Sequence, residues 1–276
     1  MVILARVSEM KPPRKSSLDA LKPLVISAPF GNYIQPVGTT PTLGTFTAAA
    51  RPGRVMQVLK TVRRYRRIGA WVNKIGLRNP GMPWLVERVK AGKVDVADKI
   101  VSIHGFTDAD WRQLLEQAAA IKPLAVELNM SCPNVGEIIH DENLFADALA
   151  TLPGAGVVPG VIVKLPPVRY AAMVEQAVDA GVRMFHCCNT LPVPAGGISG
   201  KPLMPLSLEC VAALRQRYGN ELRIIGGGGI TTPEDIARYR DAGADHFAIG
   251  TKVMHPKYLW WHESLQLLIA AAQNQN

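Results

Sequence analysis

The feature that most constrains the fold is a repeated alternation of short apolar runs with helical patterns. Runs rich in β-branched residues are separated by stretches whose apolar residues recur at helical spacing. We expect strands at residues 24–28, 42–47, 100–104, 124–129, 160–165, 182–187, 222–227 and 245–250. We expect helices near residues 54–67, 83–90, 108–121, 142–150, 168–180, 206–218, 233–242 and 256–272. Two of them begin with capping-box patterns, Thr107 with Asp110 and Thr232-Pro233 with Asp235. Strands that are apolar nearly throughout are typical of a parallel sheet covered on both faces.

Eight strand–helix units of this kind close naturally into a (β/α)8 TIM barrel, and 276 residues is a normal length for one such barrel. A doubly wound open sheet is the alternative. No linker, repeat or low-complexity block divides the chain, so we predict one α/β domain over residues 23–276, after an irregular N-terminal segment over residues 1–22. In either arrangement, active groups gather where strands end and the following loops begin.

Composition restricts the setting. Four cysteines without metal-ligand spacing favour a reducing, cytoplasmic location, and no apolar stretch reaches the length of a membrane span. The net charge is +9, and part of it lies at residues 60–71. A nucleic-acid patch or a membrane-surface helix is one interpretation of that segment. We favour a solvated helix face with Val62, Tyr65 and Ile68 packed inward, and we do not expect nucleic acid as a partner.

Two glycine-rich loops follow the last two expected strands. "IIGGGGITTPED" (224–235) runs from a strand into a helix with a capping-box pattern, and "AIGTK" (248–252) follows one strand later. Glycines let a backbone approach a ligand closely, and a helix N-terminus attracts anions. These loops predict a phosphate site; a tight turn that needs glycine is the alternative. A third cluster, "PAGGISGKPL" (194–203), predicts a long functional loop, or else a flexible surface loop.

The stretch "ELNMSCPNVGE" (127–137) places a cysteine directly after a buried strand. Cys132 precedes a proline, so it is expected in a loop at the catalytic end, as a nucleophile or a general base. A nucleophile usually needs a histidine nearby, and His140 and His186 are candidates. The remaining cysteines are expected to be small core residues: Cys187, Cys188 and Cys210.

Four asparagines fall in expected loops or at strand ends: Asn73, Asn129, Asn134 and Asn189. A neutral amide both donates and accepts hydrogen bonds. Such groups suit a planar substrate with alternating carbonyl and N–H groups. Each asparagine alone could instead stabilise a turn or a helix end.

Together these motifs resemble the dihydroorotate dehydrogenase family, in particular the soluble class that uses a cysteine base. The resemblance covers roughly residues 23–256. It rests on "ELNMSCPNV", "NKIGLRNPG" (73–81), "VSIHG", "VKLPP", "CCNT", "GGISG", "IIGGGGI" and "IGT", which occur in family order. "SCPNVGE" is also similar to the flavin domain of dihydropyrimidine dehydrogenase.

The resemblance implies an FMN-binding barrel that oxidises a dihydropyrimidine. Cys132 would remove the proton from C5 while a hydride leaves C6 for the flavin N5, and Lys164 would lie against the flavin ring. The implied substrate-binding residues are Asn73, Ile75, Gly76, Leu77, Asn129, Asn134, Asn189 and Thr190. The implied cofactor-binding residues are Ala28, Gly31, Asn129, Lys164, Gly197, Gly228, Gly229, Gly250 and Thr251.

Two segments depart from the family pattern. The family carries a lysine at the end of strand two that touches flavin and substrate, whereas residues 39–54 contain no lysine, and Phe46 or a neighbour stands in its place. The family's first-strand "NASG"-type segment is replaced by "SAPFG" (27–31). The sequence also lacks iron–sulfur cysteine motifs and a second nucleotide domain. We therefore expect an electron acceptor, of unknown identity, to reach the FMN directly or through a partner protein.

The lead hypothesis is an FMN-dependent dehydrogenase that oxidises dihydroorotate, or a closely related dihydropyrimidine, to orotate. Soluble members of the family are often dimers, so the resemblance implies a possible homodimer. Three alternatives stay open. They are a flavin enzyme for a different ring or enone, a flavin-free phosphate-binding barrel such as a Lys164 Schiff-base aldolase or an isomerase, and a non-catalytic relative.

Overall fold

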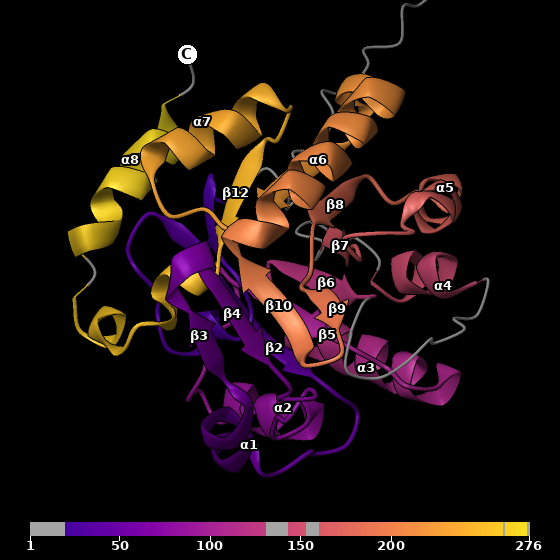
Figure 1. Cartoon of the computed structure of the whole chain (residues 1–276). Helices are drawn as coiled ribbons and strands as arrows, with labels where there is room; N and C mark the ends of the chain where they lie inside the picture. Colours follow the sequence, from indigo (N-terminus) through magenta and orange to yellow (C-terminus); the bar gives the residue numbers. More distant parts are fainter. Residues whose placement is uncertain (1–19, 131–142, 153–159, 262, 275–276) are drawn as a thin grey trace, which may run out of the picture.

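The computed structural model describes residues 20–130, 143–152, 160–261 and 263–274. Its centre is a closed barrel of parallel strands in the order β1-β12-β11-β8-β7-β6-β5-β2 (Figure 1). The prediction of a (β/α)8 barrel is confirmed, and the open sheet is excluded. The strands are β1 (Leu24–Ile26), β2 (Thr39–Phe46), β5 (Ile100–Ile103), β6 (Ala125–Asn129), β7 (Gly160–Lys164), β8 (Met184–Cys187), β11 (Arg223–Gly227) and β12 (His246–Ile249).

Closure occurs at β1, because this strand pairs with a neighbour on each side. Val25 lies opposite Ala248 of β12 and opposite Thr40 of β2. Along β1, Leu24 and Ile26 belong to the large apolar cluster between strands and helices, whereas Val25 belongs to a smaller cluster. Since successive side chains point to opposite faces of a strand, the smaller cluster fills the inside of the barrel.

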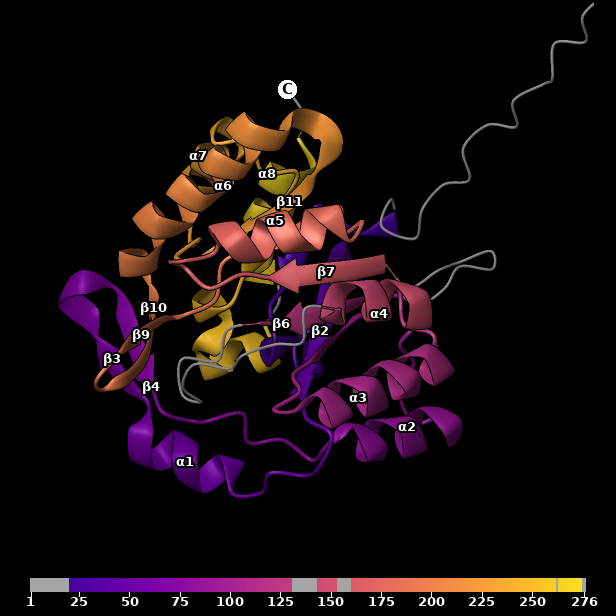
Figure 2. The ribbon, with the colours of Figure 1, turned by 90° about the vertical axis from the view of Figure 1, so that its right-hand side faces the viewer.

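The outer layer consists of helices that follow the strands along the chain (Figures 1 and 2). They are α2 (Met82–Lys90), α3 (Asp108–Ile121), α4 (Leu144–Thr151), α5 (Ala171–Asp179), α6 (Met204–Tyr218), α7 (Pro233–Asp241) and α8 (Gln266–Gln273). The expected caps are present: Thr107 accepts from the backbone N–H of Asp110, and Asp235 accepts from that of Thr232. None of the helices in the described ranges is long and apolar enough to cross a membrane.

A second, antiparallel sheet lies beside the barrel, in the strand order β3-β4-β10-β9. Figure 2 shows it on the side toward which the arrowhead of β7 points, which is the carboxyl end of the barrel strands. The strands are β3 (Arg63–Tyr65), β4 (Ala70–Asn73), β9 (Leu191–Val193) and β10 (Gly196–Gly200). The expectation of a structureless loop over residues 194–203 is therefore wrong, since pairing with the distant β4 orders this glycine-rich stretch.

The basic segment at residues 60–71 also differs from the expectation. Helix α1 (Arg54–Thr61) ends early, and the next residues form β3, in which Arg64 lies opposite Trp71. Tyr65 and Ile68 are 49% and 55% exposed rather than packed inward, because the strand leaves no helical face to bury.

Short 3-10 helices complete the described chain. They are η2 (Phe30–Asn32), η3 (Arg66–Ile68), η4 (Lys201–Leu203), η5 (Gly219–Glu221), η6 (Thr251–Met254), η7 (Pro256–Leu259) and η8 (Glu263–Leu265). The last expected helix, near 256–272, is thus divided into η7, η8 and α8.

Candidate active site

Two of the expected site residues are the last residues of adjacent barrel strands. Asn129 ends β6 and Lys164 ends β7, and the two lie opposite each other in the β-ladder. Lys164 in turn lies opposite His186 of β8. The Asn129 and Lys164 side chains are buried, although amide and ammonium groups normally prefer water. The carboxyl end of the barrel therefore collects polar groups in the place where barrels of this type bind their ligands.

The expected substrate amides are connected to one another. Asn189 Nδ2 donates to Asn129 Oδ1 at 2.8 Å, and the backbone N–H of Thr190 donates to Asn189 Oδ1 at 2.8 Å. Asn129 Nδ2 donates to Thr45 Oγ1 at 3.1 Å. His104 Nδ1 lies 2.7 Å from the carbonyl oxygen of Asn129. These bonds hold the two amide planes in one orientation before any ligand arrives.

Beneath the amides lies a buried carboxylate, Glu127 of β6. Its Oε2 accepts from His186 Nδ1 at 2.7 Å, and its Oε1 lies 3.9 Å from Lys164 Nζ. Burial alone would raise the pKa of Glu127, but the charge of Lys164 and the hydrogen bond from His186 outweigh it and lower that pKa to about 2. Burial and the Lys164 charge lower the pKa of His186 below its usual value. At neutral pH the group is thus an ionised carboxylate with a neutral imidazole.

The structure at the end of β2 shows which residue occupies the place of the lysine that the family resemblance leads one to expect. Phe46 is buried and stacks on Trp84 of α2, so it packs outside the barrel. The register shifts between Leu43 and Phe46, and Gly44 adopts φ +104°, a left-handed backbone that favours glycine. This irregularity brings Thr45 Oγ1 to 2.9 Å from Ser102 Oγ of β5. The neighbour of Phe46 that faces the site is therefore Thr45, a neutral hydroxyl.

The expected substrate loop begins where β4 ends. Asn73 is the last residue of β4 and lies opposite Gly197 of β10, so an expected substrate residue and an expected cofactor residue are neighbours. Asn73 Oδ1 accepts from the backbone N–H of Ile75 at 3.4 Å. Gly76 and Leu77 follow with positive φ.

Asn79, which sequence reasoning did not single out, anchors this loop to the barrel. Its Nδ2 donates to the carbonyl of Leu77 at 2.7 Å and to Thr47 Oγ1 at 2.9 Å. Its Oδ1 accepts from the backbone N–H groups of Thr47 and Gly81. The side chain is buried, so each of these bonds is shielded from water.

The glycine loop after β11 is a place where a side chain would not fit. A Cβ on Gly229, at φ +75°, would lie 2.8 Å from the carbonyl oxygen of Gly200. Gly228 also has positive φ, and its carbonyl accepts from the Tyr239 hydroxyl at 2.8 Å. Two glycines are therefore required by the backbone path, which brings main chain rather than side chains to the barrel mouth.

The sequence predicts that the N-terminus of α7 contributes to the phosphate site, but the backbone N–H groups there already have an acceptor. The Asp235 carboxylate already accepts from the backbone N–H groups of Thr231 and Thr232, and it contacts Lys201 Nζ at 2.6 Å. The N-terminus of α7 is thus occupied by its own cap. One strand later, η6 begins at Thr251 after Gly250, with no side-chain cap. This short extra helix is where TIM barrels commonly bind phosphate.

Residues 27–31, which follow the first strand, contribute close packing to the site rather than charged groups. A Cβ on Gly31 would lie 2.4 Å from the carbonyl oxygen of Thr42, so Gly31 is needed for close packing on β2 whatever it binds. A Cβ on Gly250 would meet Phe30 and Ser27 at 3.7 Å, which is ordinary contact distance. Ala28 lies between these two features and is partly buried.

Several expected residues lie outside the described ranges: Cys132, Asn134 and His140. The other three cysteines are buried free thiols, as expected for core residues. Burial raises the pKa of Cys188 to about 12, which disfavours a reactive thiolate. Among the described residues, no group of His, Cys, Asp and Glu has the geometry to hold a metal ion.

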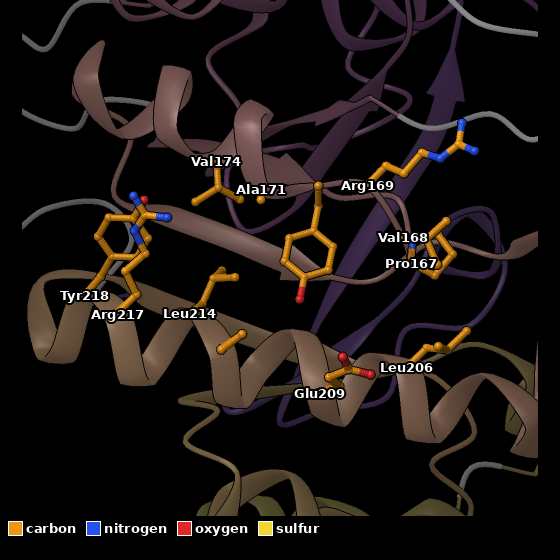
Figure 3. A pocket seen from close by; sticks show the side chains of 12 residues that line it. Pro167, Val168, Arg169, Ala171, Val174, Leu206, Glu209, Leu214, Arg217 and Tyr218 are labelled. Carbon is orange, nitrogen blue, oxygen red and sulfur yellow. The ribbon is translucent and has the colours of Figure 1, made fainter.

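A cavity of about 440 Å³ lies away from this cluster, between α5 and α6. Figure 3 shows Val174 and Leu214 facing each other across it. Arg217 at its edge is paired with Glu175 at 2.6 Å. The cavity contains none of the expected site residues, so the polar cluster at the carboxyl end is the candidate active site.

The polar residues that sequence reasoning missed are Thr45, Asn79, Ser102, His104 and, in its observed role, His186. Residues of these types are common in strands and loops, so their sequence positions alone do not indicate a site. One signal was available: Glu127 interrupts the apolar run "LAVELN", and a carboxylate in a buried strand needs a partner. His186 had been a candidate partner for a cysteine, but its Nδ1 contacts Glu127.

Comparison with known proteins agrees with this geometry. The catalytic subunit of dihydroorotate dehydrogenase B (NAD(+)) from Latilactobacillus sakei is 34% identical over 209 residues, which are 65% of this chain and 66% of that protein. A putative dihydroorotate dehydrogenase A (fumarate) from Aquifex aeolicus is 29% identical over 204 residues, 65% of this chain and 66% of that protein. The match spans slightly less than two thirds of each relative.

The fold is also that of solved structures. Ligand-free DHODH from Eimeria tenella superimposes with a TM-score of 0.75 at 18% identity, covering 91% of this chain and 83% of that one. The same enzyme with ferulenol gives 0.73 at 17% identity, over 90% and 80%. A family model described as dihydroorotate dehydrogenase matches residues 37–270, which is most of the chain. With the barrel and its polar carboxyl end, this match establishes that the chain belongs to the dihydroorotate dehydrogenase family.

Proposed function

We propose that this chain is an FMN-dependent oxidoreductase that oxidises dihydroorotate, or a closely related dihydropyrimidine, to orotate. The observation that carries the proposal is the juxtaposition of the Asn129–Asn189 amide pair with the Lys164 ammonium at the carboxyl end of the barrel. Amides recognise the alternating carbonyl and N–H groups of a pyrimidine, and a cation stabilises a reduced, anionic flavin. The family match supports the same reaction.

The chain's residues fit a flavin mononucleotide. Gly228 and Gly229 keep side chains out of the loop after β11, and the uncapped start of η6 at Thr251 suits a phosphate group. Lys164 Nζ donates no hydrogen bond to a described residue, so its N–H groups suit a ligand. Ala28, Gly31, Gly197 and Gly250 complete the proposed cofactor set. When bound, the flavin supplies the chemistry of accepting a hydride.

The remaining roles belong to side chains of this chain. The pyrimidine ring is held with help from the backbone of residues 75–77 and by five residues: Asn73, Asn129, Asn134, Asn189 and Thr190. Cys132, three residues beyond the end of β6, removes the proton from C5 as the hydride leaves C6. The two electrons leave with the hydride, and the proton stays on the thiol until solvent takes it.

The acceptor, assembly and location are part of the proposal. The similar proteins are described as NAD(+) and fumarate types, so an acceptor of either class, reached directly or through a partner, is proposed. A homodimer and a cytoplasmic location complete it; the free thiols among the described cysteines are consistent with a reducing compartment.

The test is a visible spectrum of the purified protein before and after anaerobic addition of dihydroorotate. We expect a yellow protein that bleaches with the native chain and with a Cys210→Ala control. The Cys132→Ala variant should stay yellow for far longer, because the base contributes about 10²–10⁴-fold. Bleaching of Cys132→Ala at the native rate would reject Cys132 as the base. A colourless protein that cannot be reconstituted with FMN would reject the whole proposal, and borohydride trapping at Lys164 would then test the aldolase alternative.

One observation favours a second candidate. Thr45 presents a neutral hydroxyl where the family pattern leads one to expect a lysine cation. A flavin oxidoreductase for a less anionic dihydropyrimidine or an enone is therefore the runner-up. Faster bleaching by dihydrouracil than by dihydroorotate would favour it, and the opposite order would remove it.

A further inference from the structure

Three charged or titratable residues form a buried group next to the amide pair. Glu127, Lys164 and His186 come from the neighbouring strands β6, β7 and β8, and their side chains are 1%, 8% and 2% exposed. Glu127 precedes Asn129 by two residues, so both side chains point into the barrel in successive layers. Glu127 therefore lies at the floor of the candidate active site, while Lys164 is in register with Asn129 above it.

The contacts of Glu127 are unequal. Its Oε2 is held by His186 Nδ1 at 2.7 Å, whereas its Oε1 has no hydrogen-bond partner among the described residues. The nearest cation to Oε1 is Lys164 Nζ at 3.9 Å, which is too long for a hydrogen bond. The carboxylate thus faces the ammonium through space, and charges buried in this way are weakly screened.

The charge of Lys164 and the hydrogen bond from His186 keep the carboxylate ionised. Burial would raise its pKa, but Lys164, His186 and Ser102 act in the opposite direction and prevail. Ser102 is itself held by Thr45 at 2.9 Å. Because the imidazole is neutral, the group contains one anion and one cation, and their separation decides the field above them.

We propose that Glu127, locked by His186, is a counter-charge that sets how much of the Lys164 positive charge a bound flavin senses. This inference rests on the proposed function only in requiring a flavin at the site. Glu127 is a positioning residue, because it acts through Lys164 and not by touching substrate. Removing its negative charge leaves Lys164 uncompensated, and an anionic flavin ring is then stabilised.

Sulfite measures this effect without turnover, since it adds to flavin N5, bleaches the visible band and leaves the ring anionic. A charge close to a titrating group typically shifts its ionisation equilibrium by about 1–3 logarithmic units. We therefore expect Glu127→Gln to lower the sulfite dissociation constant by about tenfold or more. The flavin midpoint potential should rise in the same variant. Glu87→Gln, an exposed carboxylate on α2, is the control for net charge and should match the native protein.

His186 provides a second and independent pair of variants. His186→Phe removes the donor to Oε2, so the Glu127 carboxylate is no longer fixed and its pKa rises, although the Lys164 charge still lowers it; the sulfite dissociation constant should move from the native value toward that of Glu127→Gln. His186→Gln keeps an N–H donor and should resemble the native protein. If Glu127→Gln does not fold, this pair decides the question. A sulfite dissociation constant within about twofold of native in a folded, flavin-loaded Glu127→Gln overturns the inference. If that variant does not fold, equal sulfite dissociation constants in His186→Phe and His186→Gln overturn it.

The two proposals fail separately. A native protein that binds flavin but is not bleached by dihydroorotate rejects the proposed substrate, while the sulfite comparison still decides the role of Glu127. A native protein that binds no flavin rejects both.

Discussion

Thr45 and Asn129 are 84 residues apart in the chain, yet Thr45 Oγ1 accepts a hydrogen bond from Asn129 Nδ2 at 3.1 Å. The same hydroxyl lies 2.9 Å from Ser102 Oγ. One side chain on β2 therefore connects the amide pair above to the hydroxyl next to Glu127 below. It is the link between the substrate-facing layer and the charged floor of the candidate site.

Replacement of this hydroxyl by a methyl group tests the link. Thr45→Val keeps the shape but removes the acceptor of Asn129 Nδ2 and the partner of the Ser102 hydroxyl, so we expect the free energy of unfolding to fall by about 1–2 kcal/mol. The affinity for orotate should also fall, because only the bond from Asn189 then orients the Asn129 amide. Thermal denaturation and orotate-induced changes in the flavin band would measure both. Thr45→Ser should retain native values, and native orotate affinity in Thr45→Val would contradict the link.

The glycine loop can be tested with a matched pair of left-handed glycines. Gly229→Ala should weaken FMN binding and stability, because its Cβ would lie 2.8 Å from the Gly200 carbonyl oxygen and the residue sits at φ +75°. Gly53→Ala carries the same backbone strain, at φ +91°, but meets nothing within 4 Å. The difference in FMN dissociation constant between the two variants isolates the steric part. Equal FMN binding in both would show that the loop does not need to stay free of side chains.

Asp235 caps α7, so its replacement should lower the free energy of unfolding far more than replacement of the adjacent Glu234. Asp235 accepts from two backbone N–H groups and pairs with Lys201, and its side chain is 6% exposed. Asp235→Asn leaves the Lys201 charge and the helix terminus poorly satisfied, so we expect a loss of about 2–3 kcal/mol in unfolding free energy. Urea denaturation would measure it. The neighbouring exposed Glu234→Gln is the control, and an equal effect of the two changes would contradict the assignment.

Two histidines predict a loss of stability in mild acid. Burial lowers the pKa of His186 and of His246 below 6.5 in the folded chain. Above about pH 6.5 both histidines are neutral in the folded and unfolded chains, so their contribution is fully present. Below pH 6.5 the unfolded chain takes up protons that the folded chain does not. The free energy of unfolding therefore decreases as the pH falls toward the histidine pKa of the folded chain, by at most about 1.4 kcal/mol per pH unit for each histidine.

Melting temperatures at pH 7.5, 6.5 and 5.5 would test this titration. We expect a decrease toward pH 5.5 that is smaller in His246→Gln, since one of the two groups is then absent. His255→Gln, at an exposed position, is the control and should follow the native protein. A melting temperature that rises as the pH falls would have the wrong sign and would reject the account.

Sequence alone determined that the chain forms a parallel α/β fold and where its strands end, whereas closure into a barrel rather than an open sheet was decided by the structure. The strands at 100–103, 125–129 and 160–164 are mainly apolar, and such runs favour burial on both faces of a strand. Lys164 and Asn129 could be assigned to strand ends for the same reason. Local chemistry also predicted the caps at Thr107 and Asp235, because a cap involves residues only a few positions apart.

Other features depended on contacts between distant segments. Strand β10 is short and glycine-rich, and it is ordered because β4 on one side and β9 on the other supply its hydrogen bonds. The bulge at Gly44 turns Thr45 rather than Phe46 toward the site, and the sequence of β2 alone does not predict this orientation. The pairing of Glu127 with His186 joins residues 59 positions apart. A sequence states which groups must find partners, but only closure of the barrel decides which partners lie within hydrogen-bonding distance.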